Sequence, residues 1–154
     1  MAELKEGDKA PDFLKKYAGL DKKDLKGKKI ILYFYPKDNT PGCTVEACNL
    51  RDNYDDLRSK GFEVIGVSPD SEKRHINFKE KNNLPFTLIP DTEKEILNDY
   101  GVWGEKRMYG RTYMGVFRTT FIINEKGIIE KIIRKVKTKE HTEQIYKELG
   151  ISEL

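Results

Sequence analysis

An uninterrupted apolar run, IILYFY, occupies residues 30–35 and ends at Pro36. Apolar residues without alternation are typical of a strand that is buried on both faces. A second run, FEVIGVS at residues 62–68, is followed by Pro69 and Asp70, which favour a turn. The pattern therefore predicts two central strands of a buried sheet.

Helical spacing follows each of these runs. In residues 43–61 the apolar positions recur three or four apart, which predicts one helix that ends at Gly61. Residues 71–82 predict a polar helix that turns Ile76 and Phe78 inward.

The second half of the chain alternates short elements of both kinds. Residues 86–91 predict a strand, and residues 92–101 a short helix capped by Thr92 and stopped by a glycine. Residues 116–136 form two β-rich runs around the turn sequence NEKG, which indicates a hairpin. Residues 138–149 predict a closing helix.

The order β-α-β-α-β-α-β-β-α predicts an α/β fold with a mixed central sheet flanked by helices. The sequence shows no repeat and no linker, so we expect one domain spanning residues 1–154. Ligands of such folds bind where the carboxyl ends of strands meet the amino ends of helices. NTPGC, residues 39–43, lies at such a junction.

Composition narrows the function classes. Apolar residues make up 37% and charged residues 36% of the 154 residues, as in a compact chain with a polar surface. The 29 basic and 26 acidic residues are interspersed, so we expect no nucleic-acid partner. No apolar run approaches the roughly 18 residues that span a bilayer, and the N-terminus lacks the apolar segment of a secretory signal. We therefore expect a cytoplasmic protein that does not enter membranes.

Both cysteines of the chain fall within NTPGCTVEAC, residues 39–48. A metal site, a structural disulfide, or a reactive thiol with a second thiol that resets it would each explain the pair. Zinc usually takes four Cys or His ligands, and His75 and His141 are far along the chain and expected at the surface. A permanent disulfide is unusual in a reducing compartment. A reactive pair, buried thiols and a two-cysteine metal site completed by carboxylates remain as interpretations.

The position of Cys43 favours reactivity. In the first turn of a helix, a thiol meets unpaired backbone N–H groups and the positive end of the helix dipole, and both favour the thiolate. Pro41 suits the helix entry, and Gly42 allows close approach to the sulfur. Five residues along an ideal helix place the Cα atoms of Cys43 and Cys48 about 8.5 Å apart, beyond the roughly 7 Å limit of a disulfide. A bond between them would require the first turns to unwind.

The stretch YFYPKDNTPGCTVEAC resembles the peroxiredoxins, and within them the Q-type, also called bacterioferritin comigratory proteins. The family pattern P-x-x-x-T-x-x-C is matched by Pro36, Thr40 and Cys43, and the second cysteine of the Q-type by Cys48. Asn39 stands where aspartate is more usual, outside the catalytic positions.

Further along, residues 101–127 are similar to the segment that carries the active-site arginine of the family, which falls on Arg118. In this segment Asn124 replaces a more usual aspartate, again outside the catalytic positions. The similarity extends over nearly the whole chain, from residue 4 to residue 145.

The resemblance implies a thioredoxin-like fold and a thiol-specific peroxidase that reduces hydrogen peroxide and organic hydroperoxides. It assigns Cys43 as the nucleophile that becomes a sulfenic acid. It assigns Cys48 as the resolving thiol that closes an intramolecular disulfide, which a thioredoxin-type protein then reduces. It implies no metal, haem, flavin or nucleotide cofactor, and a cycle within one chain makes a monomer the expectation.

The resemblance also assigns supporting roles. Arg118 donates hydrogen bonds to thiolate and peroxide, and Thr40 holds the peroxide in line. Glu46, one helical turn after Cys43, orients the arginine, and Pro36 shields the sulfur from water.

Taken alone, these supporting residues have simpler explanations. Arg118 would be a surface ion pair, Thr40 a turn cap and Glu46 a solvated carboxylate near a helix start. The aromatic residues of the arginine segment could line the pocket, although such residues are more often part of a core. They are Trp103, Tyr109, Tyr113 and Phe117.

Two other functions are compatible with the same residues. A dithiol-disulfide oxidoreductase would normally carry C-x-x-C, whereas four residues separate the thiols here. A redox-sensing module would react once and stop, and the sequence shows no extra domain or charged tail for a partner.

Overall fold

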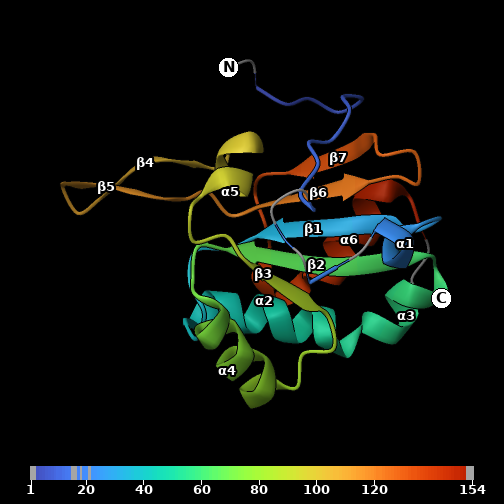
Figure 1. Ribbon diagram of the computed structural model, residues 1–154, viewed down its shortest axis with the longest axis horizontal. Helices are drawn as coiled ribbons and strands as arrows, with labels where there is room; N and C mark the ends of the chain where they lie inside the picture. The colour runs from blue at the N-terminus through green and yellow to red at the C-terminus, as the bar shows by residue number, and fades with distance from the viewer. Residues whose placement is uncertain (1–2, 15–16, 18, 21, 152–154) are drawn as a thin grey trace.

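The computed structural model describes residues 3–14, 17, 19–20 and 22–151 (Figure 1). A five-stranded sheet in the order β3-β2-β1-β6-β7 forms its centre. β1 pairs in parallel with β2 and antiparallel with β6, so the sheet is mixed, as predicted. The strands are β1 Lys29–Phe34, β2 Phe62–Ser68, β3 Thr87–Pro90, β6 Thr119–Ile123 and β7 Ile129–Ile133.

The central strand β1 is buried on both faces, which confirms the reading of its apolar run. Because side chains alternate along a strand, Ile31 and Tyr33 enter one core cluster. Leu32 and Phe34 enter a second cluster on the opposite face. The sheet therefore separates two cores, and each needs its own cover.

Four helices cover the face that holds Tyr33. Each contributes a fully buried side chain to this core: Ala47, Leu57, Phe78 and Ile145. The other face is covered by α5, Glu95–Asp99, and by apolar residues of the N-terminal segment such as Phe13. The four helices are α2 Pro41–Asp52, α3 Tyr54–Ser59, α4 Glu72–Asn82 and α6 His141–Leu149. Two short elements complete the helices, α1 Lys22–Leu25 and the 3-10 turn η1 Thr138–Glu140.

Three local predictions were wrong. The helix expected over residues 43–61 is interrupted at Asn53, which separates α2 from α3. Ile76 of α4 is 51% exposed, and His75 takes the inward position together with Phe78. Lys94, with a left-handed backbone, precedes α5 in place of a Thr92 cap.

A second sheet was not anticipated. β4, Trp103–Met108, and β5, Arg111–Val116, pair antiparallel as an arm that projects from the body (Figure 1). Three aromatic residues of this segment do not belong to a core, because Tyr109 is 97%, Tyr113 41% and Phe117 42% exposed. Trp103 is half-buried and packs against the core cluster that holds Phe34. The predicted β-run over residues 116–123 is consequently divided, and Arg118 lies in the break between β5 and β6.

None of the helices in the described part of the chain is both long and apolar enough to cross a membrane.

Candidate active site

The NTPGC segment lies between the end of β1 and the start of α2. Thr40 is the N-cap residue of α2, with an extended backbone, and Pro41 occupies the first turn. Asn39 adopts a left-handed backbone with a φ of 64°, which turns the chain into the helix. The helix therefore begins two residues before Cys43 and places this thiol in its first turn.

Cys43, Arg118 and Glu46 form a hydrogen-bonded chain. Nη2 of Arg118 donates to Sγ of Cys43 at 3.3 Å. Nη1 of the same guanidinium donates to Oε1 of Glu46 at 2.6 Å. The guanidinium therefore places a positive charge beside the sulfur of Cys43, at the start of α2.

Two features bring Arg118 to the helix. The break between β5 and β6 directs its side chain toward α2, so that the residue meets a thiol 75 positions earlier in the sequence. Gly42 provides the space, because a Cβ at this position would lie 3.3 Å from Nη2 of Arg118. The group that Gly42 admits to the sulfur is therefore the guanidinium.

Glu46 is fully buried, which excludes the solvated carboxylate as an explanation. Burial raises the pKa of Glu46 to about 7, and the charge and hydrogen bond of Arg118 offset part of the rise. Burial acts to lower the pKa of Arg118, but Glu46 and Cys43 outweigh it and raise this pKa above its ordinary value. The guanidinium thus stays charged, whereas the carboxylate lies close to its titration point near neutral pH.

His141 lies next to Glu46. It is buried and not at the surface, as had been expected. Its Nδ1 faces Oε1 of Gln144 at 3.0 Å, and its Nε2 faces the hydroxyl of Thr120 at 2.8 Å. Burial lowers the pKa of His141 to about 4, so the ring is neutral at pH 7. An amide oxygen only accepts, so the ring proton is on Nδ1 and Nε2 accepts from Thr120.

This arrangement leaves Glu46 with one unbonded oxygen. Oε2 lies 3.7 Å from Nε2 of His141, which has no proton to donate. Within the described residues, Oε2 has no hydrogen-bond partner. Arg118 is consequently the group that compensates the buried charge of Glu46, and the pairing holds the guanidinium in place.

Thr40 and Pro36 lie on the loop that precedes α2. The hydroxyl of Thr40 donates to the carbonyl of Lys37 at 2.8 Å and makes no capping bond to the helix. Its two lone pairs remain available to a bound molecule. Pro36 directly follows the buried Tyr35 and is itself half-buried.

Cys48 lies on another side of α2. Its Sγ is 3.8 Å from Oδ1 of Asn82, at the end of α4, whereas Cys43 faces Arg118. Cys48 is half-buried and Cys43 is 1% exposed, and both thiols are free. One continuous helix carries the two residues, as the spacing argument assumed.

The loop is tied down by a buried network that the sequence reading missed. Oδ2 of Asp38 lies 2.6 Å from Nδ1 of His75, and Oδ1 accepts from the hydroxyl of Tyr35 at 2.6 Å. Nε2 of His75 reaches the carbonyl of Ile89 on β3 at 3.1 Å. Since Asp38 is two residues before Thr40, the network fixes the loop to α4 and β3.

A periodicity signal for both histidines was present in the sequence. His75 and Phe78 are three apart, and His141 and Ile145 are four apart, so each histidine shares a helix face with a buried residue. The expectation of surface histidines was therefore wrong, and the helical spacing indicates the buried position of both.

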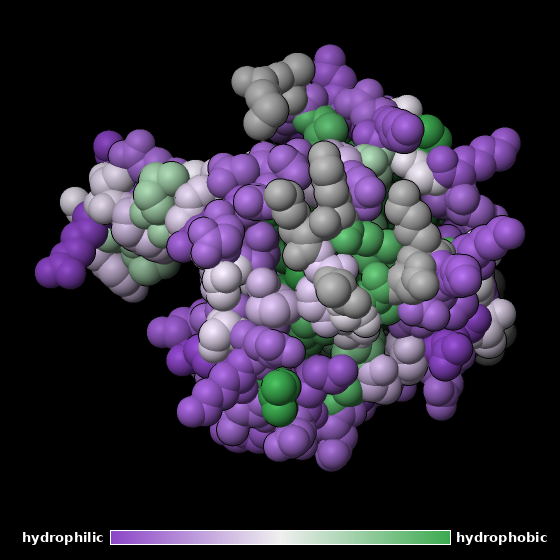
Figure 2. All heavy atoms as spheres, viewed as in Figure 1, coloured by the Kyte–Doolittle hydropathy of each residue, from purple (hydrophilic) through white to green (hydrophobic). Residues whose placement is uncertain are grey.

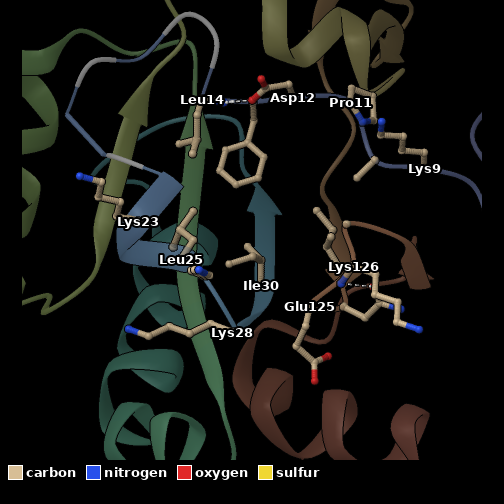
Figure 3. A pocket seen from close by; sticks show the side chains of 16 residues that line it. Lys9, Pro11, Asp12, Leu14, Lys23, Leu25, Lys28, Ile30, Glu125 and Lys126 are labelled. Atoms are coloured by element: carbon tan, nitrogen blue, oxygen red, sulfur yellow. Dashed lines mark hydrogen bonds between the residues drawn. The ribbon is translucent and has the colours of Figure 1, made fainter.

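A pocket of about 490 Å³ lies where β1 begins and β6 ends (Figure 3). Cys43 follows the other end of β1. Leu14, Leu25 and Ile30 lie within it, and lysine side chains, including Lys28 and Lys126, surround it. None of the candidate site residues lines this pocket. It is separate from the thiol chemistry.

The chain is similar to known proteins over most of its length. Residues 6–132 match the model of the AhpC/TSA family. The chain is 50% identical over 138 residues to Peroxiredoxin Bcp of Bacillus subtilis, covering 88% of both chains. It is 44% identical over 144 residues to Peroxiredoxin Bcp of Escherichia coli, covering 92% of both.

Solved structures show the same fold. A PrxQ of Xylella fastidiosa superposes with a TM-score of 0.86 at 30% identity, covering 97% of this chain and 98% of that one. The bacterioferritin comigratory protein of Xanthomonas campestris, described with its alkyl peroxide reduction activity, superposes with a TM-score of 0.79 at 32% identity, covering 87% and 86%. The expected thioredoxin-like fold is therefore confirmed.

A mixed sheet with a thiol at the start of α2 and an arginine beside it defines a thiol peroxidase of the thioredoxin-like class. The chain belongs to the AhpC/TSA family. Its relatives identify it as a peroxiredoxin of the Q or Bcp type, which confirms the resemblance read from the sequence.

Proposed function

We propose that this protein reduces hydrogen peroxide and organic hydroperoxides with Cys43 as nucleophile, Cys48 as resolving thiol and a thioredoxin-type protein as reductant. The contact that carries the proposal is the hydrogen bond from Arg118 to Sγ of Cys43. It places a permanent charge where the thiolate forms and where the peroxide oxygens would lie.

In the first step the Cys43 thiolate attacks one peroxide oxygen. An S–O bond forms, the O–O bond breaks, and the leaving oxygen takes a proton and departs as water or an alcohol, leaving Cys43 as a sulfenic acid. Preorganised donors to the leaving oxygen contribute about 3 to 4 kcal/mol each in comparable sites. Arg118 would supply such donors, the Thr40 hydroxyl would hold the peroxide in line by accepting a hydrogen bond from it, and Pro36 would limit access of water.

In the second step the sulfur of Cys48 attacks the sulfenic sulfur. The S–S bond forms and the hydroxyl of the sulfenic acid leaves as water. Because α2 holds the two thiols on different sides, the first turns have to unwind before the sulfurs meet. A dithiol protein then returns both sulfurs to thiols.

Burial of Glu46 assists the unwinding. Its pKa of about 7 shows that its charge is poorly accommodated in the folded helix, and unwinding would release it to water. The carboxylate would thus have two roles. It positions Arg118 for peroxide attack and limits the stability of the helix turn that has to open.

We further propose a monomer that acts in the cytoplasm. The two thiols, Arg118 and Glu46 come from one chain, so the cycle requires no second subunit.

Two substitutions and a mass measurement test the proposal. Wild-type protein is reduced, mixed with hydrogen peroxide and followed by stopped-flow fluorescence and intact mass. We expect oxidation at about 10⁴ M⁻¹s⁻¹ or faster, with loss of two hydrogens as the Cys43–Cys48 disulfide forms. Cys43→Ser should abolish this reaction, whereas Cys48→Ser should oxidise once and accumulate a product heavier by one oxygen.

The two variants serve as controls for each other. If the Cys43→Ser variant still reduced peroxide with turnover, the nucleophile would be Cys48 and not Cys43. Normal thioredoxin-driven cycling by Cys48→Ser would remove the resolving role. If wild-type protein reacted as slowly as a free thiol, the arrangement of Arg118 and Thr40 would not constitute a peroxide site.

A further inference from the structure

The arm formed by residues 103–117 exposes apolar side chains to an unusual extent. Tyr109 is 97%, Met114 55% and Met108 53% exposed. The arm is a separate two-stranded sheet, and isolated hairpins are only marginally stable in water. Pale green atoms on the projection in Figure 2 show the same apolar character amid a hydrophilic surface.

The strand register shows which side chains lie together on one face of the arm. Lys106 lies opposite Tyr113, and Met108 opposite Arg111, so these four side chains share a face. Phe117 continues it, because its ring fills the space above Gly104 and lies 6.0 Å from the ammonium of Lys106. The face is thus a stripe of aromatic and methionine side chains interleaved with basic groups.

The stripe leads to the reactive thiol. Phe117, at its inner end, directly precedes Arg118, which donates to Sγ of Cys43. A molecule bound at the inner end of the arm would therefore lie next to the residue that contacts the thiol. Exposed apolar patches near a reactive site are typical of surfaces that bind another protein.

The charge of the arm indicates what kind of partner protein would bind it. Lys106, Arg107 and Arg111 outnumber the single acidic residue of the arm, Glu105, and the whole chain has a net charge of +3. A second copy of the chain would bring like charges together, which opposes association through the arm. An apolar surface bordered by acidic residues would complement it.

We propose that the arm is the docking surface for the dithiol protein that reduces the Cys43–Cys48 disulfide, and that this partner presents an apolar, acidic surface around its thiols. The inference rests on the proposed function. In the exchange, a partner thiolate attacks one sulfur of the disulfide and releases the other as a thiolate. The second partner thiol then attacks the mixed disulfide, so two electrons and two protons pass to Cys43 and Cys48.

Steady-state kinetics with two reductants test the docking role. Lys106→Glu/Arg111→Glu, which reverses the two basic residues of the stripe, is compared with wild type in peroxide turnover driven by a bacterial thioredoxin or by dithiothreitol. We expect kcat/KM for thioredoxin to fall about tenfold at low ionic strength and the difference to shrink in salt. Turnover with dithiothreitol, which needs no docking surface, should stay unchanged.

The matched control reverses two charges at the other end of the sheet. Lys26 and Lys126 line the distant pocket, and Lys26→Glu/Lys126→Glu changes the net charge by the same amount. We expect it to retain wild-type kcat/KM for thioredoxin. A second arm variant, Met108→Ser/Tyr113→Ser, should lose thioredoxin turnover without any change of charge.

Equal losses in the arm and control charge variants would overturn the docking role, as would unchanged thioredoxin turnover in both arm variants. A wild-type dimer in sedimentation that the arm substitutions dissociate would also overturn it, because a second copy would then occupy the arm. If dithiothreitol but not thioredoxin supported wild-type turnover, the reductant class and the docking role would fail together. Slow oxidation of wild type by peroxide would instead contradict the peroxidase proposal itself.

Discussion

At the scale of the residue, two properties of Glu46 oppose each other. Its charge holds Arg118 against Cys43, and its complete burial makes that charge costly. The neutral ring of His141 offers no proton to its second oxygen, so the cost is not relieved. The pKa near 7 makes both effects depend on pH around neutrality.

Glu46→Gln tests this dependence. In wild type, oxidation by peroxide should fall as pH decreases through about 7, because protonated Glu46 loses its charge pairing with Arg118. The variant should lack this inflection and react about tenfold more slowly at pH 8, as expected for loss of a charged hydrogen bond. Stopped-flow rate constants between pH 5 and 9 provide the measurement.

The same variant has a stability signature. The folded pKa of Glu46 lies above its ordinary value of 4.5, so its contribution to the free energy of unfolding declines as pH rises from about 4.5 to about 7. His141, whose folded pKa is lowered from 6.5 to about 4, contributes the opposite slope in both proteins. Urea unfolding should thus show that Glu46→Gln gains stability relative to wild type across this range. A constant difference between the two proteins would mean that Glu46 does not titrate there.

At the scale of the element, α2 has two differently anchored halves. Its C-terminal half is fixed to η1 and α6, where Asn49 donates to the carbonyl of Lys139 and accepts from Thr142. Its N-terminal half depends on the burial of Cys43 and on the Glu46–Arg118 pair. Unwinding limited to the first turns would therefore leave the rest of the helix in place.

Substitutions of Val45 would change the stability of the first turns of α2 without replacing a residue of the site. It is 37% exposed within the segment that has to unwind. Alanine has a higher helix propensity than valine, and glycine is about 1 kcal/mol less favourable than alanine. We expect Val45→Ala to close the disulfide more slowly than wild type and Val45→Gly to close it faster, with about fivefold between the two variants.

Rapid-quench mass spectrometry separates the two steps for these variants. The rate of sulfenic acid formation should be equal in all three proteins, because Val45 faces away from the thiol and Arg118. Identical rates of disulfide closure in the alanine and glycine variants would show that unwinding of the first turns does not limit resolution.

At the scale of the molecule, stability and interaction surfaces are separated. Phe121 lies between the rings of Phe34 and Tyr100 in the core, with centroid distances of 5.7 and 5.0 Å. The tip of the arm, at Tyr109, is almost fully exposed. Substitutions in the two places should therefore affect different properties.

We expect Phe121→Ala to reduce the free energy of unfolding by about 3 to 5 kcal/mol, because a buried aromatic ring is lost and a cavity remains. Tyr109→Ser should change it by less than about 0.5 kcal/mol. Urea denaturation followed by circular dichroism measures both values. A loss above about 1 kcal/mol in the arm variant would show that the arm packs against the body in solution.

The sequence by itself determined the central strands, because a short apolar run such as residues 30–35, rich in Ile and Tyr and ended by a proline, is typical of a strand that is buried on both sides. It also determined the thiol at a helix start, since proline and glycine act on the backbone locally. The distance between the Cα atoms of Cys43 and Cys48 followed from ideal helix geometry alone. Each of these signals depends only on residues that are close to one another in the sequence.

The tertiary structure decided what depends on distant residues. Only the fold brings Arg118 to a thiol 75 positions away, buries Glu46 against His141, and joins Asp38 to His75. The break between β5 and β6, which both directs Arg118 and ends the arm, has no local signal in a continuous β-rich run. Burial of a polar side chain is set by the partners that packing supplies, and periodicity indicates only which face it occupies.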